Sequence, residues 1–275
     1  MINRLYQKSY GEIIRKIIHP IIVNSFKLIR RHKLNVVGTV PKKGPYIYVI
    51  NHYCIQDIPI AGEVIHEHVY LLVSSISKGS IDGLEAFLNG VVWTNRLDKE
   101  DRKRAHDELV RHLKLGHNIL MCPEATWNLS PNLPVLPMNY GCVSISQETN
   151  VPIVPIYLYF TKDRCDVEVN DPYIPCHDKI EAIAEIRDIM ATSAWKFMES
   201  HGVMSRDCFP DNYWENDIAE RYSKYSRARK DPAGVREYEK QFIFRPKGYA
   251  TPEEVFGHIK ILEPNSNNAF LFRER

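Results

Sequence analysis

The stretch that decides the fold is YIYVINHYCIQD, from Tyr46 to Asp57. Its first five residues are apolar or aromatic, which is typical of a buried strand. A proline at position 59, followed by apolar residues at helical spacing, predicts that a helix begins just after the stretch. Open α/β sheets bind their ligands where a strand ends and a helix begins. The polar residues 51–57 are therefore expected to form a site.

Within this stretch, His52 is followed five positions later by Asp57, and none of the other ten histidines has an aspartate at that offset. An imidazole can accept a proton near neutral pH. A carboxylate on its other ring nitrogen fixes the tautomer and stabilises the imidazolium. The pair is therefore a candidate general base and its orienting acid. The spacing alone also fits a loop histidine that is hydrogen-bonded near the aspartate of a helix N-terminus.

The rest of the chain alternates between strand and helix patterns. Strands are predicted at 36–40, 69–74, 91–93, 118–122, 151–160 and 166–170, and helices at 81–88, 98–115, 140–148 and 178–200. The alternation predicts an α/β fold with a mixed, mostly parallel sheet flanked by helices. Pro152 and Pro155 predict that the first half of 151–160 is an edge strand or is irregular.

The chain has 275 residues and is 44% apolar, which favours one domain with appended segments. Residues 34–200 hold the alternating pattern. Residues 201–275 are polar, charged and aromatic without a repeat, and are interpreted as a C-terminal extension of unknown role. Residues 1–33 carry eight Lys or Arg and one acid, a charge of +7, so the remainder carries −5.

The basic N-terminus also contains apolar residues at helical spacing over 9–31, interrupted by Pro20. This pattern predicts an amphipathic helical pair that lies in the interface of an anionic membrane. The alternative is a helix that packs on the protein core and leaves its basic residues in solvent. The longest uncharged run, 125–147, is too rich in proline and polar residues to span a membrane.

The six cysteines are scattered without a Cys-x-x-Cys pair, which predicts reduced thiols in a cytosolic setting. His66, His68, His106, His112 and His117 lack acids at ligand spacing and are predicted to be solvated. No metal site is therefore expected.

Two further polar clusters follow predicted strands, at Thr94-Asn95-Arg96 and at Pro123-Glu124-Ala125-Thr126-Trp127-Asn128. Together with Asn51-His52 to Asp57 and with Val151-Pro152-Ile153-Val154-Pro155, they occur in an order that resembles the 1-acylglycerol-3-phosphate acyltransferase family, the lysophospholipid acyltransferases. The resemblance covers about residues 33–200. In that family the third block reads Pro-Glu-Gly-Thr-Arg-Ser, so Ala125 and Trp127 depart from it.

The resemblance implies acyl transfer from a thioester, acyl-CoA or acyl carrier protein, to a hydroxyl of a lysophospholipid such as 1-acylglycerol-3-phosphate. His52 would be the general base and Asp57 its orienter, without a metal or a cofactor. Arg96 would bind the acceptor's phosphate, and Glu124 would bind an acceptor hydroxyl or shape its loop. Ala125, Thr126 and Trp127 would complete the substrate site. Without the family's arginine at position 127, the identity of the acceptor is open.

The expected partners are the lysolipid, the thioester donor and an anionic membrane surface, with no nucleic acid. The expected location is the cytoplasmic side of a membrane, as a peripheral (monotopic) protein. Two alternatives remain at this point. One is acyl transfer to a non-phosphorylated hydroxyl or amine, and the other is a catalytically silent membrane-surface binding protein. Because no Gly-x-Ser-x-Gly elbow is present, a serine acyl-enzyme is not expected.

Overall fold

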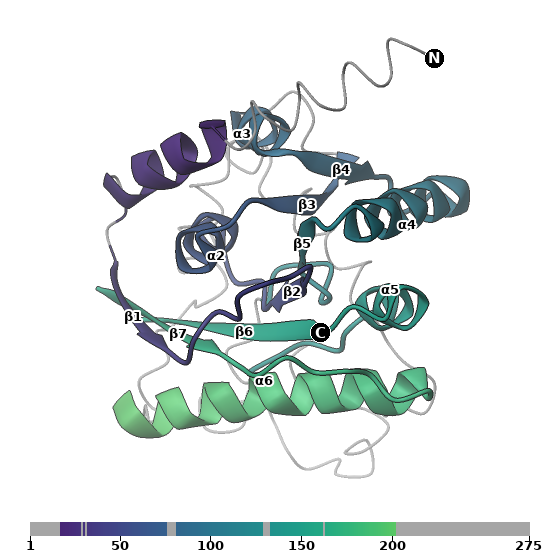
Figure 1. Cartoon of the computed structure of the whole chain (residues 1–275). Coiled ribbons are helices and arrows are strands. Elements are labelled where there is room, and N and C mark those ends of the chain that lie inside the picture. The colour runs from purple at the N-terminus through teal and green to yellow at the C-terminus, as the bar shows by residue number, and fades with distance from the viewer. Residues whose placement is uncertain are drawn as a thin grey trace, which may run out of the picture.

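The computed structural model describes residues 17–28, 30, 32–75, 81–128, 133–161 and 163–201. They form a seven-stranded sheet in the order β1-β7-β6-β2-β5-β3-β4 (Figure 1). The strands are β1 (Lys33–Val37), β2 (Ile47–Ile50), β3 (Val69–Ser74), β4 (Val91–Thr94), β5 (Asn118–Met121), β6 (Ile153–Phe160) and β7 (Arg164–Val169). Only the β6–β7 pair is antiparallel among them, which confirms the predicted mixed, mostly parallel α/β sheet.

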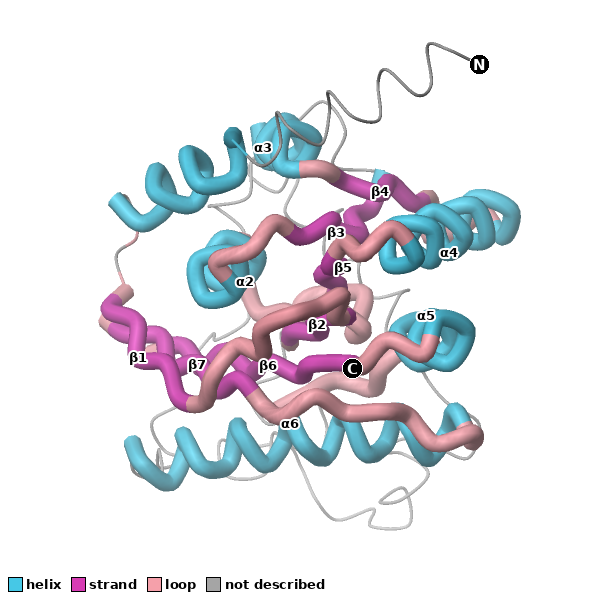
Figure 2. Tube along the Cα trace, in the orientation of Figure 1, coloured by secondary structure: helices cyan, strands magenta, loops and turns pink. Residues whose placement is uncertain are grey.

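Helices cover both faces of the sheet (Figure 2). They are α2 (Asp57–Ile65), α3 (Ile81–Asn89), α4 (Lys99–Lys114), α5 (Gly141–Thr149) and α6 (Lys179–His201). One apolar core joins α4, α5 and α6 to one face of the strands, and a second core joins α2 to the other face. Because both faces are buried, the central strands read as continuous apolar runs rather than alternating ones.

The register of the parallel strands brings the polar clusters that hold His52 and Glu124 to the same edge of the sheet. Val49 of β2 lies beside Met121 of β5 on one side and beside Pro155 of β6 on the other. Parallel neighbours end at the same edge of a sheet. The segments that follow β2 and β5, which hold His52 and Glu124, therefore leave the sheet side by side.

The prediction that Pro152 and Pro155 make the first half of 151–160 an edge strand or irregular holds only in part: β6 begins at Ile153, and its pairing with β7 begins at Ile156. β6 lies between β7 and β2, with Pro155 in the ladder beside Val49. The carbonyl of Pro155 accepts from the Asn170 backbone N–H at 2.9 Å, just beyond the last residue pair between β6 and β7. The missing proline N–H faces that same side, so the ladder to β2 loses no hydrogen bond.

β1 begins at Lys33, three residues before the predicted strand at 36–40. It ends at Val37 and is followed by Gly38, whose φ is +84° and whose backbone passes so close to Val169 that an added Cβ would lie 2.1 Å from the Val169 carbonyl oxygen. Only glycine fits this approach. The apolar residues that follow, read as strand from sequence, therefore belong to the loop before β2.

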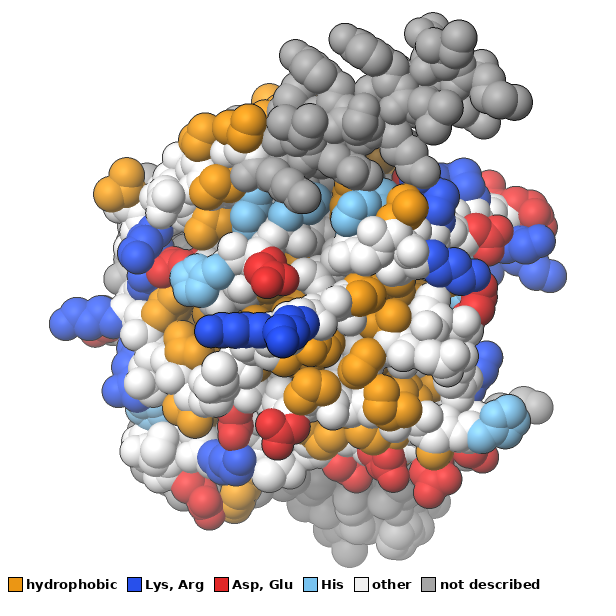
Figure 3. Space-filling view, in the orientation of Figure 1, with side chains coloured by type: hydrophobic (Ala, Val, Ile, Leu, Met, Phe, Trp, Pro, Cys, Tyr) orange, Lys and Arg blue, Asp and Glu red, His pale blue; other side chains and the backbone are white. Residues whose placement is uncertain are grey.

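Residues 17–28 form a helix, while the first half of the predicted N-terminal pair lies outside the described residues. One face of this helix packs on the protein: His19 is 5% exposed, and its Nδ1 lies 2.7 Å from the Asn89 side-chain oxygen at the end of α3. Beyond the helix, Arg30 donates to both carboxylate oxygens of Glu63 in α2 at 3.0 and 3.1 Å. The other face exposes Ile17 and Ile21, each by 59%. Figure 3 shows hydrophobic side chains (orange) on the surface at the upper left of the molecule, where this helix lies in Figure 1.

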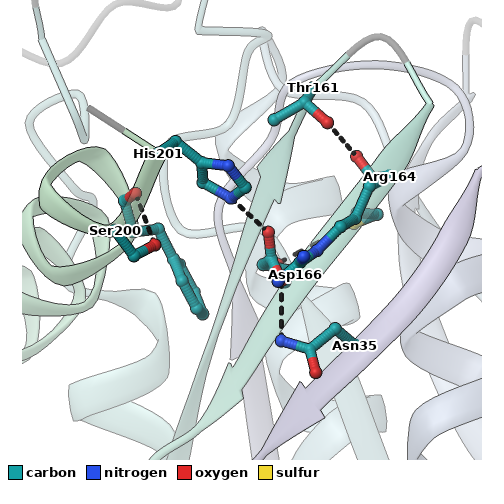
Figure 4. A network of polar contacts seen from close by, with 8 residues as sticks. Asn35, Thr161, Arg164, Asp166, Ser200 and His201 are labelled. Carbon is teal, nitrogen blue, oxygen red and sulfur yellow. Dashed lines mark hydrogen bonds and ion pairs between the residues drawn. The ribbon is translucent and has the colours of Figure 1, made fainter. Parts of the chain in front are cut away.

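A polar network fixes the end of α6 to the sheet (Figure 4). The fully buried carboxylate of Asp166 accepts from Asn35 of β1 at 2.7 Å and from Arg164 of β7 at 2.7 Å, and His201 Nε2 lies 2.6 Å from it. These donors hold the pKa of Asp166 below its ordinary value despite the burial that opposes ionisation. The network joins β1, β7 and α6. The C-terminal extension, interpreted as residues 201–275, lies outside the described residues after His201.

The prediction of solvated histidines is wrong for His112, which is 6% exposed and stacks on Tyr70 with ring centroids 3.6 Å apart. His106 pairs with Glu148 at 2.9 Å.

Among the described residues no group of histidines, cysteines and acids could hold a metal ion, and the five described cysteines are free thiols. None of the described helices combines the length and the apolar character that a membrane span requires.

Candidate active site

Asn51 anchors the loop that follows β2. Its side-chain Nδ2 donates to the Leu158 carbonyl at 3.0 Å, and its Oδ1 accepts from the Leu158 N–H at 2.7 Å. These two hydrogen bonds from the Asn51 side chain take the place of one further pair of backbone hydrogen bonds between β2 and β6. Because both bonds are buried, water does not compete for them. The backbone of His52 therefore leaves the sheet from a fixed position.

His52 and Asp57 lie together as predicted. Nδ1 of His52 donates to Oδ2 of Asp57 at 2.9 Å. The same oxygen accepts the backbone N–H groups of Tyr53 at 2.5 Å and of Cys54 at 2.8 Å, so the fully buried carboxylate is well compensated. The bond at Nδ1 leaves Nε2 of His52 as the nitrogen that can accept a proton. With 21% of its side chain exposed, His52 remains accessible to a substrate.

Glu124 joins the loop after β2 to the loops after β5. One of its carboxylate oxygens accepts the His52 N–H at 3.0 Å, and the other accepts the Leu136 N–H at 3.0 Å. Glu124 is 0% exposed, and burial raises its pKa to about 8. Of its two expected roles, this geometry favours shaping the loop, because both oxygens are occupied by backbone groups and neither faces solvent.

The environment of His52 favours its protonated form. Burial of the imidazole opposes protonation, but Cys122 and Asp57 favour it, and the pKa of His52 is raised well above 6.5. A general base must be unprotonated to act. The site is therefore expected to gain activity as pH rises through neutrality.

The second and third blocks are also in contact. Arg96, just after β4, donates through Nη1 to the Ala125 carbonyl. Trp127 lies against His52, with ring centroids 5.9 Å apart and planes at 84°. Thr126 between them is 3% exposed, so its side chain belongs to the interior of the loop. The structure thus brings Arg96, Ala125 and Trp127 to the edge that holds His52.

Ala125 occupies the position where the resembled family has glycine, and its backbone shows why. Its φ is +60°, in the left-handed region that residues with a Cβ rarely adopt. The turn is closed by the Ala125 N–H, which donates to the Cys122 carbonyl at 3.0 Å. The departure from the family pattern therefore leaves this turn intact, at a cost of about 1–2 kcal/mol for the left-handed alanine.

Two features of the site were not found from the sequence. Tyr53 stacks on Phe160 at the end of β6, with ring centroids 5.2 Å apart and planes at 13°, so two aromatic rings lie beside the loop that follows β2. Cys122, the first residue after β5, is one of the groups that raise the pKa of His52. The available signal for Cys122 was its position between a buried strand and the third block.

Comparison with known proteins agrees with this geometry. The family model described as Acyltransferase matches residues 33–159. The chain is 28% identical over 177 residues to the 1-acyl-sn-glycerol-3-phosphate acyltransferase alpha of Ovis aries, covering 55% of this chain and 58% of the relative. It is 24% identical over 159 residues to the chloroplastic 1-acyl-sn-glycerol-3-phosphate acyltransferase BAT2 of Brassica napus, covering 57% and 44%. The chain thus spans about half the length of these curated relatives.

A solved structure shares the fold. The crystal structure of the 1-acyl-sn-glycerophosphate acyltransferase PlsC from Thermotoga maritima superposes with a TM-score of 0.55 at 18% identity, covering 70% of this chain and 82% of that one. Residues 33–159, which match the family model, contain the His52–Asp57 pair, Arg96 and the block from Glu124 to Trp127. Over residues 33–159 the chain thus matches the Acyltransferase family model, and its similarity to these curated relatives is to 1-acylglycerol-3-phosphate acyltransferases.

Proposed function

We propose that the protein transfers an acyl group from a thioester donor, acyl-CoA or acyl carrier protein, to a hydroxyl of a lysophospholipid such as 1-acylglycerol-3-phosphate. The observation that carries this proposal is the His52–Asp57 pair. At the edge of the sheet it combines a partly exposed imidazole with a buried carboxylate on Nδ1, which leaves Nε2 as the nitrogen that can accept a proton. An imidazole oriented in this way can remove a proton from a hydroxyl group.

In this reaction, His52 removes the acceptor's hydroxyl proton, and the imidazolium that forms is stabilised by the Asp57 carboxylate. Backbone N–H groups near the third block are proposed to stabilise the oxyanion that develops on the acyl carbonyl. The proton then leaves with the thiol of the donor. Besides the donor and the acceptor, these steps use only groups that belong to this chain. The intact pair also opposes the alternative of a silent binding protein, since a binding surface has no use for a buried, charged orienting group.

The experiment that tests the proposal is a thiol-release assay. The full chain is incubated with acyl-CoA or acylated carrier protein and a panel of lysolipids, and the products are identified by mass spectrometry. Ester formation matched by thiol release supports the proposal. Thiol release without ester would identify a thioester hydrolase instead, and the absence of both with every pair would contradict acyl transfer.

The acceptor is proposed to carry a phosphate that is bound mainly by Arg96. Arginine binds phosphate through paired N–H donors, whereas Trp127 offers a single N–H and a large apolar face. Trp127 also lies against His52, where it would contact the acceptor beside the reacting hydroxyl. This contact favours the second candidate, an uncharged acceptor such as a monoacylglycerol, so we propose only moderate selectivity for phosphate.

Arg96→Ala is expected to lower the ratio of kcat/KM for 1-acylglycerol-3-phosphate to that for a monoacylglycerol by about tenfold or more, since a charge-assisted hydrogen bond contributes about 1.5–3 kcal/mol. Trp127→Arg is expected to raise the same ratio. Arg111→Ala, on the exposed surface of α4, is the matched control. An identical ratio in all four proteins would show that neither residue contacts the acceptor head group.

The membrane-facing surface is proposed to combine helix 17–28 with α3. Ile17, Ile21, Leu84, Phe87 and Leu88 expose between 40% and 59% of their surface, and the bond between His19 and Asn89 holds the two helices together. Apolar residues beside a strongly basic N-terminus favour the interface of an anionic membrane, on its cytoplasmic side. Helix 17–28 would therefore combine the two arrangements expected from its sequence, because one face is directed to the membrane while the opposite face packs on the protein.

The double variant Ile21→Ser/Phe87→Ser is expected to weaken binding to anionic vesicles by at least about tenfold, because each buried apolar side chain contributes about 1.5–3 kcal/mol. The control is Trp195→Ser, which removes a 61% exposed side chain from α6 on the other face of the sheet. Flotation with liposomes measures both. Equal loss in the two variants would mean that any exposed apolar residue suffices, and no loss in the double variant would place the membrane contact elsewhere.

A further inference from the structure

The basic side chains of α4 differ in their surroundings along the helix. Arg104 is paired with two acids of the same helix, with Asp101 at 2.7 Å and with Glu108 at 3.0 Å, and the basic residues after it also lie beside carboxylates. The three basic residues before Arg104 are exposed and form no ion pair with the acids that the structure describes: Lys99, Arg102 and Lys103. Positive charge is therefore left uncompensated at the start of α4.

Arg102 is the residue of this group that contacts the candidate site. Its Nη1 donates to the Arg96 carbonyl at 2.6 Å. Arg96 in turn donates through Nη1 to the Ala125 carbonyl in the third block. The two guanidinium groups are thus separated by no more than the length of one arginine residue and one hydrogen bond.

The topology of the sheet directs this part of α4 to the edge that holds His52. β4 is parallel to β3, with Thr94 beside Ser74, and β3 is parallel to β5, with Leu71 beside Leu120. Parallel strands end at the same edge of a sheet, so the loop from β4 to α4 leaves that edge together with the loops after β2 and β5. Arg102 therefore lies on the same side of the molecule as the His52–Asp57 pair.

The start of α4 offers an anion its side chains rather than its backbone. Asp98 already accepts the first backbone N–H groups of the helix, from Glu100 at 2.9 Å and from Asp101 at 3.2 Å. Cations near a helix N-terminus are disfavoured by the helix dipole, so an unpaired arginine there does not stabilise the helix. A guanidinium group does bind phosphate well, because its N–H donors form a fork that matches two phosphate oxygens.

We propose that Arg102 binds, beside Arg96, a phosphate group that a substrate carries. The proposal rests on the proposed function, because it concerns the substrates of the same site, and it makes Arg102 a further specificity-determining residue. The phosphate has two sources of the same chemistry. One is the acceptor 1-acylglycerol-3-phosphate, and the other is the CoA part of the donor.

The test compares kcat/KM for substrates with and without phosphate. With palmitoyl-CoA as the donor, 1-acylglycerol-3-phosphate is compared with a monoacylglycerol. With a monoacylglycerol as the acceptor, palmitoyl-CoA is compared with palmitoyl-pantetheine. Arg102→Gln is expected to lower the preference for the phosphorylated substrate by about three- to tenfold in one of the two comparisons, because a charge-assisted bond is lost from a site that is open to solvent.

Each result assigns or removes the phosphate. A fall in the first comparison assigns it to the acceptor, and a fall in the second assigns it to the donor. An equal fall in both would show a general attraction of anions and would overturn a bound phosphate, as would unchanged ratios in both. The matched control is Arg111→Gln, which makes the same change near the other end of α4 and is expected to leave both ratios unchanged.

The bond to the Arg96 carbonyl allows a second role, in which Arg102 only holds the loop that carries Arg96. The double variant Arg96→Ala/Arg102→Gln separates the two roles. If Arg102 contacts the phosphate itself, Arg102→Gln still lowers the ratio in the Arg96→Ala protein. If Arg102 acts only through Arg96, it has no further effect there, and the proposal is overturned.

A binding measurement needs neither turnover nor the glutamine variant. The full chain is titrated by calorimetry with sn-glycerol 3-phosphate and with CoA. Arg102→Lys, which keeps the charge but loses the fork, is expected to weaken the binding of one of them by at least about threefold. Unchanged binding of both would overturn the proposal. If the unmodified protein forms no ester with any substrate, the proposed function fails, while this titration still decides whether Arg102 binds phosphate.

Discussion

His52→Ala is expected to lower kcat/KM for acyl transfer by about 10⁴-fold, the upper end of what a positioned general base contributes. The side chain is partly exposed at the edge of the sheet, and it hydrogen-bonds to Asp57. The backbone N–H that bonds to Glu124 remains in the variant. The loss should therefore appear in catalysis, with little change in the midpoint of thermal unfolding.

The matched control for this prediction is His106→Ala. His106 is also partly exposed and also lies 2.9 Å from a carboxylate, that of Glu148, but on the surface between α4 and α5. It should retain the full rate. Steady-state kinetics of both variants measure the loss of kcat/KM, and thermal unfolding measures any change in stability. A His52→Ala protein with substantial activity would remove the histidine from the mechanism.

Asp57→Asn is expected to lower the rate by about 10⁴-fold, the loss seen when an orienting aspartate is replaced elsewhere. The amide can still accept hydrogen bonds through its oxygen, but it carries no charge to stabilise the imidazolium. Because one carboxylate oxygen of Asp57 accepts three donors, the shape of the loop should be kept while the electrostatic contribution is lost. Circular dichroism and kcat with saturating substrates separate the two effects.

Asp107→Asn, which changes an exposed aspartate of α4, is the control and should behave as the unmodified protein. If Asp57→Asn kept most of the rate, the carboxylate would serve only to hold the Tyr53 and Cys54 N–H groups. If it unfolded, Asp57→Glu would show whether the charge or the fit of the side chain is responsible.

The sequence predicted the parts of the fold that depend on local patterns. Strand β2, helix α4 and the pairing of His52 with Asp57 follow from residues close together in the chain. The helix predicted at 178–200 is also present: the carboxylate of Asp178 accepts the Ile180 N–H at 2.7 Å at the start of α6. Helix and strand patterns of this kind depend on spacing within one element.

The missed features depend on which strands become neighbours, which local patterns do not determine. The central position of β6 needs the crossover order of the sheet, so its prolines suggested an edge instead. The bond from the Leu136 N–H to Glu124 crosses between loops, and the Arg30–Glu63 pair joins the N-terminal segment to α2. The effect of Cys122 on the pKa of His52 likewise requires β2 and β5 to lie side by side. The position of Ala125 is instructive, because only its φ of +60° explains why the family has glycine there.

The central claim, that His52 held by Asp57 is the general base, is tested most directly by the pH dependence of kcat/KM, which reports the pKa of the base in the free enzyme. The pKa of His52 is raised well above 6.5, so kcat/KM should rise with pH and level off only above that value. Asp57→Asn removes a charge that favours the imidazolium, so the same rise should move to lower pH. A rise at the same pH in both proteins, or no dependence on pH above 6.5 in the unmodified protein, would contradict the account.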